Sequence, residues 1–152
     1  MDLRSYLDRT GVRYSWSHHP TTYTGQNLAE IEHTSGKKVV KPVVVEADGC
    51  LMLCALPAAF HIDLDQLRRE LNANSARILE EDEIRSLFAG CDIGAEPPIG
   101  KLFGLPTLLD DSVQKQPEVL FQAGTHEDAV RMNTDDFIRI TEPTLAHFAS
   151  TR

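Results

Sequence analysis

Residues 39–56, with the sequence VVKPVVVEADGCLMLCAL, carry the strongest local structural signal in the chain. β-Branched residues dominate 39–47, and a second apolar run, 50–56, follows directly after Asp48-Gly49. An Asp-Gly pair between two apolar runs is typical of a tight turn, since these residues tolerate the backbone angles that the turn requires. The segment therefore predicts a β-hairpin.

Helices and further strands are expected on both sides of this hairpin from apolar periodicity and capping residues. The expected helices are Leu3–Leu7 before Gly11, Thr24 to between His33 and Gly36, Asp63–Leu71, Glu81–Ala89 with Gly90 as its stop, a short helix capped by Thr134, and an amphipathic turn at Leu145–Phe148. The expected strands are Val12–Trp16, Ala76–Leu79, Thr107–Leu109, Val119–Gln122 and Val130–Met132. This irregular alternation indicates an α/β or α+β fold, with a mixed, mostly antiparallel sheet and helices packed outside.

The length and charge of the chain limit its organisation and its partners. Its 152 residues correspond to one domain, 1–152, and 15 basic against 23 acidic residues give a net charge of −8. An acidic chain without a basic stripe disfavours binding to DNA or to a long nucleic acid backbone. Apolar stretches long enough to cross a bilayer and a signal-like N-terminus are both absent, so we expect a cytoplasmic protein without a membrane partner.

The cysteines and the common catalytic motifs point away from several kinds of chemistry. Cys50, Cys54 and Cys91 are odd in number, and no histidine lies two to five residues from any of them, so reduced thiols without zinc are expected. GxSxG, P-loop, GxGxxG and HExxH patterns are missing. We therefore expect no metal, no cofactor and no covalent serine or cysteine catalysis.

Lys41 is the first candidate functional residue, because it interrupts an apolar strand. Strand alternation places it on one face with Val39, Val43 and Val45. Pro42 lacks an N–H group and extends the residue before it, which favours a sheet edge or a strand start. Taken alone, a lysine that extends its ammonium from a sheet rim into water is the commoner interpretation.

The loop 94–100, GAEPPIG, is the second candidate. Its glycines let backbone N–H groups approach a ligand, while its prolines hold the loop in shape. Several N–H groups that point at one spot would stabilise the negative charge that develops on an ester carbonyl oxygen. The alternative is an ordinary turn, since glycine and proline are common in turns.

The third candidate is His126, in the segment 123–126 that follows the expected strand 119–122. A loop at a strand end commonly presents polar groups to a site, so His126 could donate a hydrogen bond or contact a substrate. A surface histidine in a turn is the alternative interpretation. His19 and His33 are weaker candidates of the same kind. The histidines assigned to the surface are His18, His61 and His147.

Taken together, these features resemble the YbaK/prolyl-tRNA-synthetase-associated editing domain family, whose members hydrolyse wrongly charged aminoacyl-tRNA. The resemblance covers nearly the whole chain, and its free-standing members are the most similar. The matching residues are His19-Pro20, Thr24, His33-Thr34-Ser35-Gly36, Lys41 with its valines, Leu56-Pro57-Ala58, Glu81–Glu83, Leu87-Phe88, Cys91, Gly94–Pro98, Gly100, Asp110, Gly124-Thr125-His126 and Met132. The lone strand lysine and the GxxxP loop give the match its specificity.

The resemblance implies a pocket for the aminoacyl group and the terminal adenosine, lined by Lys41 and the Gly94 loop. The implied catalytic residues are Lys41, Gly94 and His126. The implied substrate-binding residues are Ala95, Pro97, Pro98, Gly100, Gly124, His33 and Thr24. Two departures from the family pattern are Pro42, where a small polar residue is frequent, and Leu79-Glu80, where a small pair is usual. Leu79 either restricts the pocket or, as we expect, packs in the core.

The expected function is trans-editing: hydrolysis of the ester in a tRNA mischarged with a small amino acid. Water is the expected nucleophile, positioned by the ribose hydroxyl or amino group of the substrate, with His126 as a less favoured base. The net charge limits contacts to the tRNA acceptor end, so delivery by an aminoacyl-tRNA synthetase or elongation factor is a further hypothesis. A non-catalytic module that binds an amino acid, nucleotide or charged tRNA end, and a purely structural interaction domain, remain as alternatives.

Overall fold

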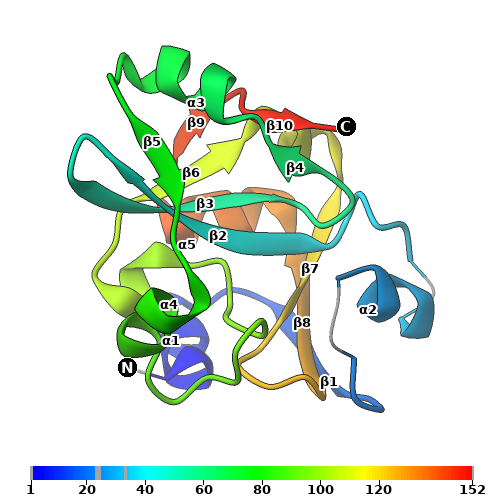
Figure 1. Cartoon of the computed structure of the whole chain (residues 1–152). Helices are drawn as coiled ribbons and strands as arrows, with labels where there is room; N and C mark the ends of the chain where they lie inside the picture. The colour runs from blue at the N-terminus through cyan, green and yellow to red at the C-terminus, as the bar shows by residue number, and fades with distance from the viewer. Residues whose placement is uncertain (1, 23–24, 33, 152) are drawn as a thin grey trace.

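The computed structural model describes residues 2–22, 25–32 and 34–151 (Figure 1). The predicted hairpin is confirmed: β2 (Val40–Ala47) and β3 (Cys50–Pro57) pair antiparallel, with Val40 opposite Pro57 and Ala47 opposite Cys50. The turn between them has positive φ angles at Asp48 (49°) and Gly49 (85°). This is the turn geometry whose twist matches that of the strands on either side.

Three further strands extend the hairpin into a five-stranded sheet within the described residues, in the order β5-β2-β3-β6-β9. The bounds are Ala76–Ile78 for β5, Thr107–Asp110 for β6 and Thr144–Ala146 for β9. β5 is antiparallel to β2, whereas β6 and β9 run parallel to their neighbours. The sheet is thus mixed, as the sequence predicted.

A second, antiparallel sheet of the described chain has the order β1-β8-β7. Its strands are β1 (Tyr14–His18), β8 (Asp128–Asn133) and β7 (Glu118–Gln122), and a short pair, β4 (His61–Ile62) and β10 (Ala149–Ser150), lies apart from it. The two larger sheets meet where Val39 forms a parallel bridge with Leu120. This junction brings the start of β2 beside β7.

Helices pack against both sheets, and they enclose separate apolar clusters on the two faces of β2 and β3. The helices are α1 (Leu3–Thr10), α2 (Gly25–Ile31), α3 (Leu64–Leu71), α4 (Glu81–Leu87) and α5 (Thr134–Thr141), with 3₁₀ turns η1 (Gly100–Phe103) and η2 (Asp111–Lys115). Val44 and Leu53 face one cluster, and Val45 and Cys54 face the other. Among the residues described, none of the helices has the length and apolar character needed to span a membrane.

Several predicted boundaries differ from the structure for tertiary reasons. β1 begins at Tyr14 rather than Val12, because pairing with β8 starts there. Asn133, not Thr134, caps α5: its side chain accepts the N–H of Asp135 at 2.9 Å.

The predicted turn at 145–148 was wrong, because 144–146 forms β9 beside β6, with Phe148 buried beyond it. α4 ends at Leu87 rather than Ala89. The predicted cap at Thr24 lies outside the described residues, and α2 ends at Ile31, before the predicted end between His33 and Gly36. Leu79 packs in the core, as expected.

Candidate functional site

Lys41 is the second residue of β2 and lies at the edge of the five-stranded sheet. β5 pairs only with residues 45–47, so the beginning of β2 extends past β5 and lies near the bridge between Val39 and Leu120 of β7. The Lys41 side chain is half-buried, and this burial lowers the pKa of its ammonium. Across the described part of the chain, that ammonium makes no hydrogen bond or ion pair. A desolvated cation without a partner is unusual for a structural lysine.

The GxxxP loop is held in place by hydrogen bonds to the end of β7. Gly124 donates its N–H to the Ala95 carbonyl at 2.8 Å, and Asp92 donates its N–H to the Gly124 carbonyl at 2.8 Å. Gly94 has φ +87°, a conformation that favours glycine. Its N–H donates to Glu96 Oε1 at 3.1 Å, and the Ala95 N–H donates to the Asp92 carbonyl at 3.0 Å. The Gly94 N–H is therefore bound to an anionic oxygen of the chain itself.

Lys41 and Gly94 line the same cavity, at the junction of the two sheets. Its volume is about 30 Å³, and it is also lined by Glu96 and Gln122. Glu96 is 6% exposed and Gln122 8% exposed. A space of this size holds one or two water molecules or one small side-chain group. The fold thus brings Lys41, Gly94, Glu96 and Gln122, which come from three separate segments, around one small volume.

Glu96 and Gln122 were not among the predicted site residues. The signal for Glu96 was a single acid between apolar residues in a loop rich in glycine and proline. The signal for Gln122 was weaker: one amide at the end of an apolar strand, two residues before Gly124. Neither pattern places the side chain beside Lys41, because that proximity depends on how the two sheets meet.

His126 lies against the loop and does not line the Lys41 cavity. Its Nε2 is 2.8 Å from the Ile93 carbonyl, and since a carbonyl oxygen only accepts, Nε2 carries a proton. A Cβ added at Gly94 would lie 3.5 Å from the His126 ring. The carbonyl of His126 also accepts the N–H of Thr22 at 2.8 Å. This geometry suits a residue that positions the Gly94 turn.

The remaining predicted residues are distributed around the site. Ala95, Pro98 and Gly100 are buried. The Gly100 N–H donates to Thr107 Oγ1 at 2.9 Å, which anchors the end of the loop. Thr24 and His33 lie outside the described residues.

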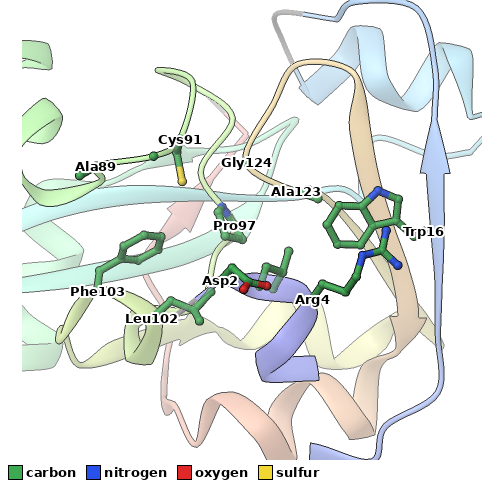
Figure 2. A pocket seen from close by; sticks show the side chains of 12 residues that line it. Asp2, Arg4, Trp16, Ala89, Cys91, Pro97, Leu102, Phe103, Ala123 and Gly124 are labelled. Atoms are coloured by element: carbon green, nitrogen blue, oxygen red, sulfur yellow. The ribbon is translucent and has the colours of Figure 1, made fainter. Parts of the chain in front are cut away.

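Pro97 and Gly124 line a different and larger cleft, of about 570 Å³ (Figure 2). Trp16 and Phe103 contribute its aromatic surface, and the Arg4 guanidinium stacks 4.1 Å from the centroid of the Trp16 ring. Glu96 lines the Lys41 cavity, whereas the next residue, Pro97, lines this cleft. This cleft is therefore much larger than the cavity lined by the candidate catalytic lysine, and it is separate from it.

Cysteine 91 borders the same cleft, and its chemistry does not suit nucleophilic attack. Burial raises the pKa of the Cys91 thiol, and it raises the pKa of Cys54 to about 12. A thiol attacks as its thiolate, so a raised pKa lowers the fraction that can react.

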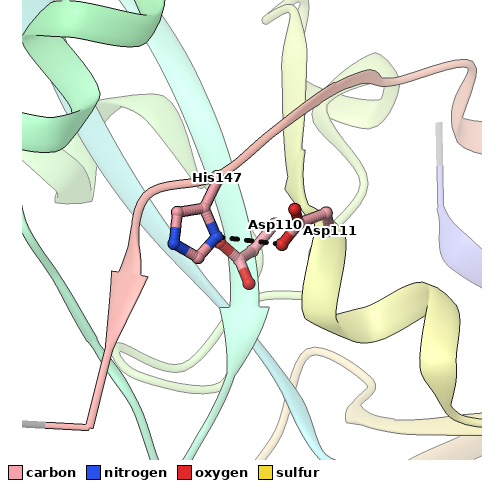
Figure 3. Close-up of side chains that lie close together, drawn as sticks. All are labelled: Asp110, Asp111 and His147. Atoms are coloured by element: carbon pink, nitrogen blue, oxygen red, sulfur yellow. Dashed lines mark hydrogen bonds and ion pairs between the residues drawn. The ribbon is translucent and has the colours of Figure 1, made fainter.

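Asp110, Asp111 and His147 form a compact group near the C-terminus (Figure 3). His147 Nδ1 lies 3.1 Å from Asp111 Oδ1, and this hydrogen bond raises the pKa of His147. Asp110 instead accepts the N–H groups of Phe148 (2.9 Å) and Ala149 (2.8 Å). The Asp110 carboxylate therefore binds the C-terminal segment to the end of β6. His147 itself is exposed, as predicted.

The fold and this cavity define a class of protein: a mixed α/β domain with a small pocket where two sheets meet, lined by apolar residues together with Lys41, Glu96 and Gln122. An aminoacyl-tRNA editing domain model matches residues 19–140. The chain therefore belongs to the aminoacyl-tRNA editing domain family. This confirms the resemblance and, at the level of the family, the expectation of an editing hydrolase.

Related proteins and structures agree with this assignment. The chain is 27% identical to the "Multifunctional Ser/Thr-tRNA deacylase ProXp-y" of Escherichia coli strain K12, over 98% of this chain and 92% of that protein. It is 23% identical to the proline–tRNA ligase of Leuconostoc citreum, covering 88% of this chain but only 23% of the ligase.

Among solved structures, one described as a candidate trans-editing enzyme for prolyl-tRNA synthetase superimposes with a TM-score of 0.84 at 23% identity, covering 97% of this chain and 94% of that one. A hypothetical protein superimposes with a TM-score of 0.88 at 15% identity, covering 97% and 99%. The fold class predicted from the sequence is thus confirmed.

Proposed function

We propose that this protein is a trans-acting deacylase that hydrolyses the ester between a small amino acid and the 3′ end of a mischarged tRNA. The observation that carries the proposal is the shared cavity of Lys41 and Gly94, in a chain of the aminoacyl-tRNA editing family. A cavity of about 30 Å³ has room for one small side chain, and therefore favours a small amino acid. The Escherichia coli relative, named as a Ser/Thr-tRNA deacylase, supports the same size class.

Lys41 supplies positive charge to the reacting ester in this proposal. Lys41 lines the cavity, and its partly desolvated ammonium makes no hydrogen bond or ion pair with the residues that the structure describes. Charge interactions are stronger in such surroundings than in water. The ammonium therefore orients the ester or stabilises the negative charge that develops as water attacks the carbonyl carbon.

Gly94 and Glu96 act as a pair in the binding step. In the free protein the Gly94 N–H holds Glu96 Oε1 at 3.1 Å. The α-ammonium of an incoming aminoacyl group is attracted to the Glu96 carboxylate, which releases the Gly94 N–H. That N–H then binds the substrate carbonyl oxygen and stabilises it as the tetrahedral intermediate forms.

Water is the nucleophile, and the products are the free amino acid and a tRNA with a free 3′ hydroxyl. The ribose hydroxyl beside the ester positions the water, since His126 is bound to the Ile93 carbonyl and does not line the cavity. His126 instead fixes the turn that carries the Gly94 N–H. This assigns it a positioning role in place of general base.

The partners follow from the charge of the protein. At −8 the protein repels the tRNA body, so contacts concentrate at the single-stranded acceptor end. A synthetase or an elongation factor that already holds the charged tRNA would deliver this end to the cavity.

The test compares Lys41→Ala with Lys37→Ala, because both remove one positive charge and Lys37 is exposed. Deacylation is measured on tRNAs charged with Ala, Ser, Thr, Cys or Pro. We expect Lys41→Ala to lower the rate by roughly 10²–10³-fold with an unchanged circular dichroism melt, and Lys37→Ala to stay near the wild-type rate.

Two results would contradict the proposal. One is a Lys41→Ala variant as active as wild type. The other is a wild-type protein that binds charged tRNA without shortening the lifetime of the ester. The second result would identify a non-catalytic binding module instead.

A further inference from the structure

Gln122 is the last residue of β7 and lines the Lys41 cavity. The residue is 8% exposed, and its Oε1 has no hydrogen-bond partner among the described residues. The backbone pairing of β7 does not require a glutamine at this position, because many residue types occur at the ends of strands. A buried amide oxygen without a partner costs free energy that an apolar side chain of the same length would not.

We propose that Gln122 is a specificity-determining residue, whose Oε1 accepts a hydrogen bond from the side-chain hydroxyl of a seryl group in the cavity. This inference rests on the proposed deacylase function. A site built to hydrogen-bond a hydroxyl discriminates strongly against the analogue without it, because its own polar group is then left unpaired. The alanyl ester is that analogue for the seryl ester.

The charges around the cavity determine which protein group binds the hydroxyl of a seryl substrate and which binds its α-ammonium. The ammonium is repelled by Lys41 and attracted by the carboxylate of Glu96, both of which line the cavity. Gln122 is neutral and offers an acceptor without attracting the cation as strongly. The hydroxyl is the remaining donor of a seryl group, so it pairs with Gln122.

The cavity size supports the same assignment. About 30 Å³ accommodates a methyl or a hydroxymethyl group, and it excludes larger apolar side chains in this conformation. Size therefore separates large amino acids from small ones, whereas alanine and serine differ too little in volume. A hydrogen-bond acceptor is what separates those two.

The experiment measures kcat/KM for seryl- and alanyl-tRNA that share one tRNA body. Gln122→Met, which keeps the length of the side chain, is compared with Gln114→Met, a loss of the same amide at an exposed position. We expect wild type to prefer the seryl ester, and Gln122→Met to reduce the Ser/Ala ratio by about tenfold or more. Gln114→Met keeps the wild-type ratio.

Two outcomes overturn the inference: a wild-type Ser/Ala ratio of one or below, or an unchanged ratio in Gln122→Met, as when both esters lose activity equally. The wild-type ratio decides the matter even if the variant fails to fold. If wild type hydrolyses none of the Ala, Ser, Thr, Cys and Pro esters, the proposed function fails separately. Binding of 3′-seryl- and 3′-alanyl-amido-adenosine to wild type and Gln122→Met then measures the hydroxyl preference, and equal wild-type affinities overturn it.

Discussion

Gly100 shows how a single residue can maintain the candidate site without lining it. A Cβ at this position would lie 2.4 Å from the Leu105 carbonyl oxygen and 2.5 Å from Thr107 Oγ1. Both distances are much shorter than a van der Waals contact, and Thr107 Oγ1 also accepts the Gly100 N–H. The resemblance implies that Gly100 binds substrate, which stays a prediction; in the structure Gly100 is buried and its N–H anchors the end of the loop.

We predict that Gly100→Ala lowers the free energy of unfolding by about 1–3 kcal/mol, because the backbone must move to admit the methyl group. Urea denaturation measures the effect. Gly36→Ala is the matched control, since its Cβ would meet Ala59 at an ordinary 3.6 Å. Equal stability of the two variants would contradict the packing argument.

At the scale of elements, Asp110 joins the end of β6 to the C-terminal segment. One carboxylate oxygen accepts the N–H groups of Phe148 and Ala149, and the other accepts the N–H and hydroxyl of Ser112. Asp110 is 1% exposed, so these donors have little access to water as a substitute. The Asp110 side chain thus accepts N–H groups of the C-terminal segment in place of backbone carbonyls.

Asp110→Ala should therefore lower the free energy of unfolding by about 2–4 kcal/mol, because several buried N–H groups lose a charged acceptor. In this variant, the N–H groups of Phe148 and Ala149 should also exchange with solvent faster than those of the five-stranded sheet. The control, Asp111→Ala, removes a neighbouring exposed carboxylate and should cost less than about 1 kcal/mol. A similar loss of unfolding free energy in both variants would contradict the role given to the hydrogen bonds that Asp110 accepts.

For the whole molecule, the net charge of −8 and the small size of the cavity together define the expected substrate contact. Proteins that neutralise many phosphates bind in a strongly salt-dependent way. An acidic protein that reaches only the acceptor end neutralises few of them. We therefore expect recognition to depend on the ester and the last nucleotides rather than on the tRNA body.

We accordingly expect a charged acceptor-stem hairpin to be deacylated with a kcat/KM within about threefold of full-length tRNA. Raising the salt concentration from 50 to 200 mM should change kcat/KM by about tenfold or less, as contact with only one or two phosphates implies. Steady-state deacylation of both substrates at several salt concentrations measures this. A thousandfold salt effect would reveal an extended tRNA-binding surface.

Local sequence determined the elements that depend on neighbouring residues. The β2–β3 hairpin follows from two apolar runs around Asp48-Gly49, and the GxxxP loop from its glycines and prolines, because turn geometry and strand propensity act over a few residues. The lone lysine in an apolar strand and its family resemblance also came from the sequence. These features were sufficient to predict the fold class and the candidate lysine.

Only the tertiary structure brought Glu96 and Gln122 to that lysine. Their positions depend on the bridge between Val39 and Leu120, which sets one sheet against the other, and on the hydrogen bonds between the loop and Gly124. Such contacts join residues that are far apart in the chain, so no local periodicity encodes them. The sequence thus determined which residue types and elements are available, and three-dimensional packing decided which of them share a cavity.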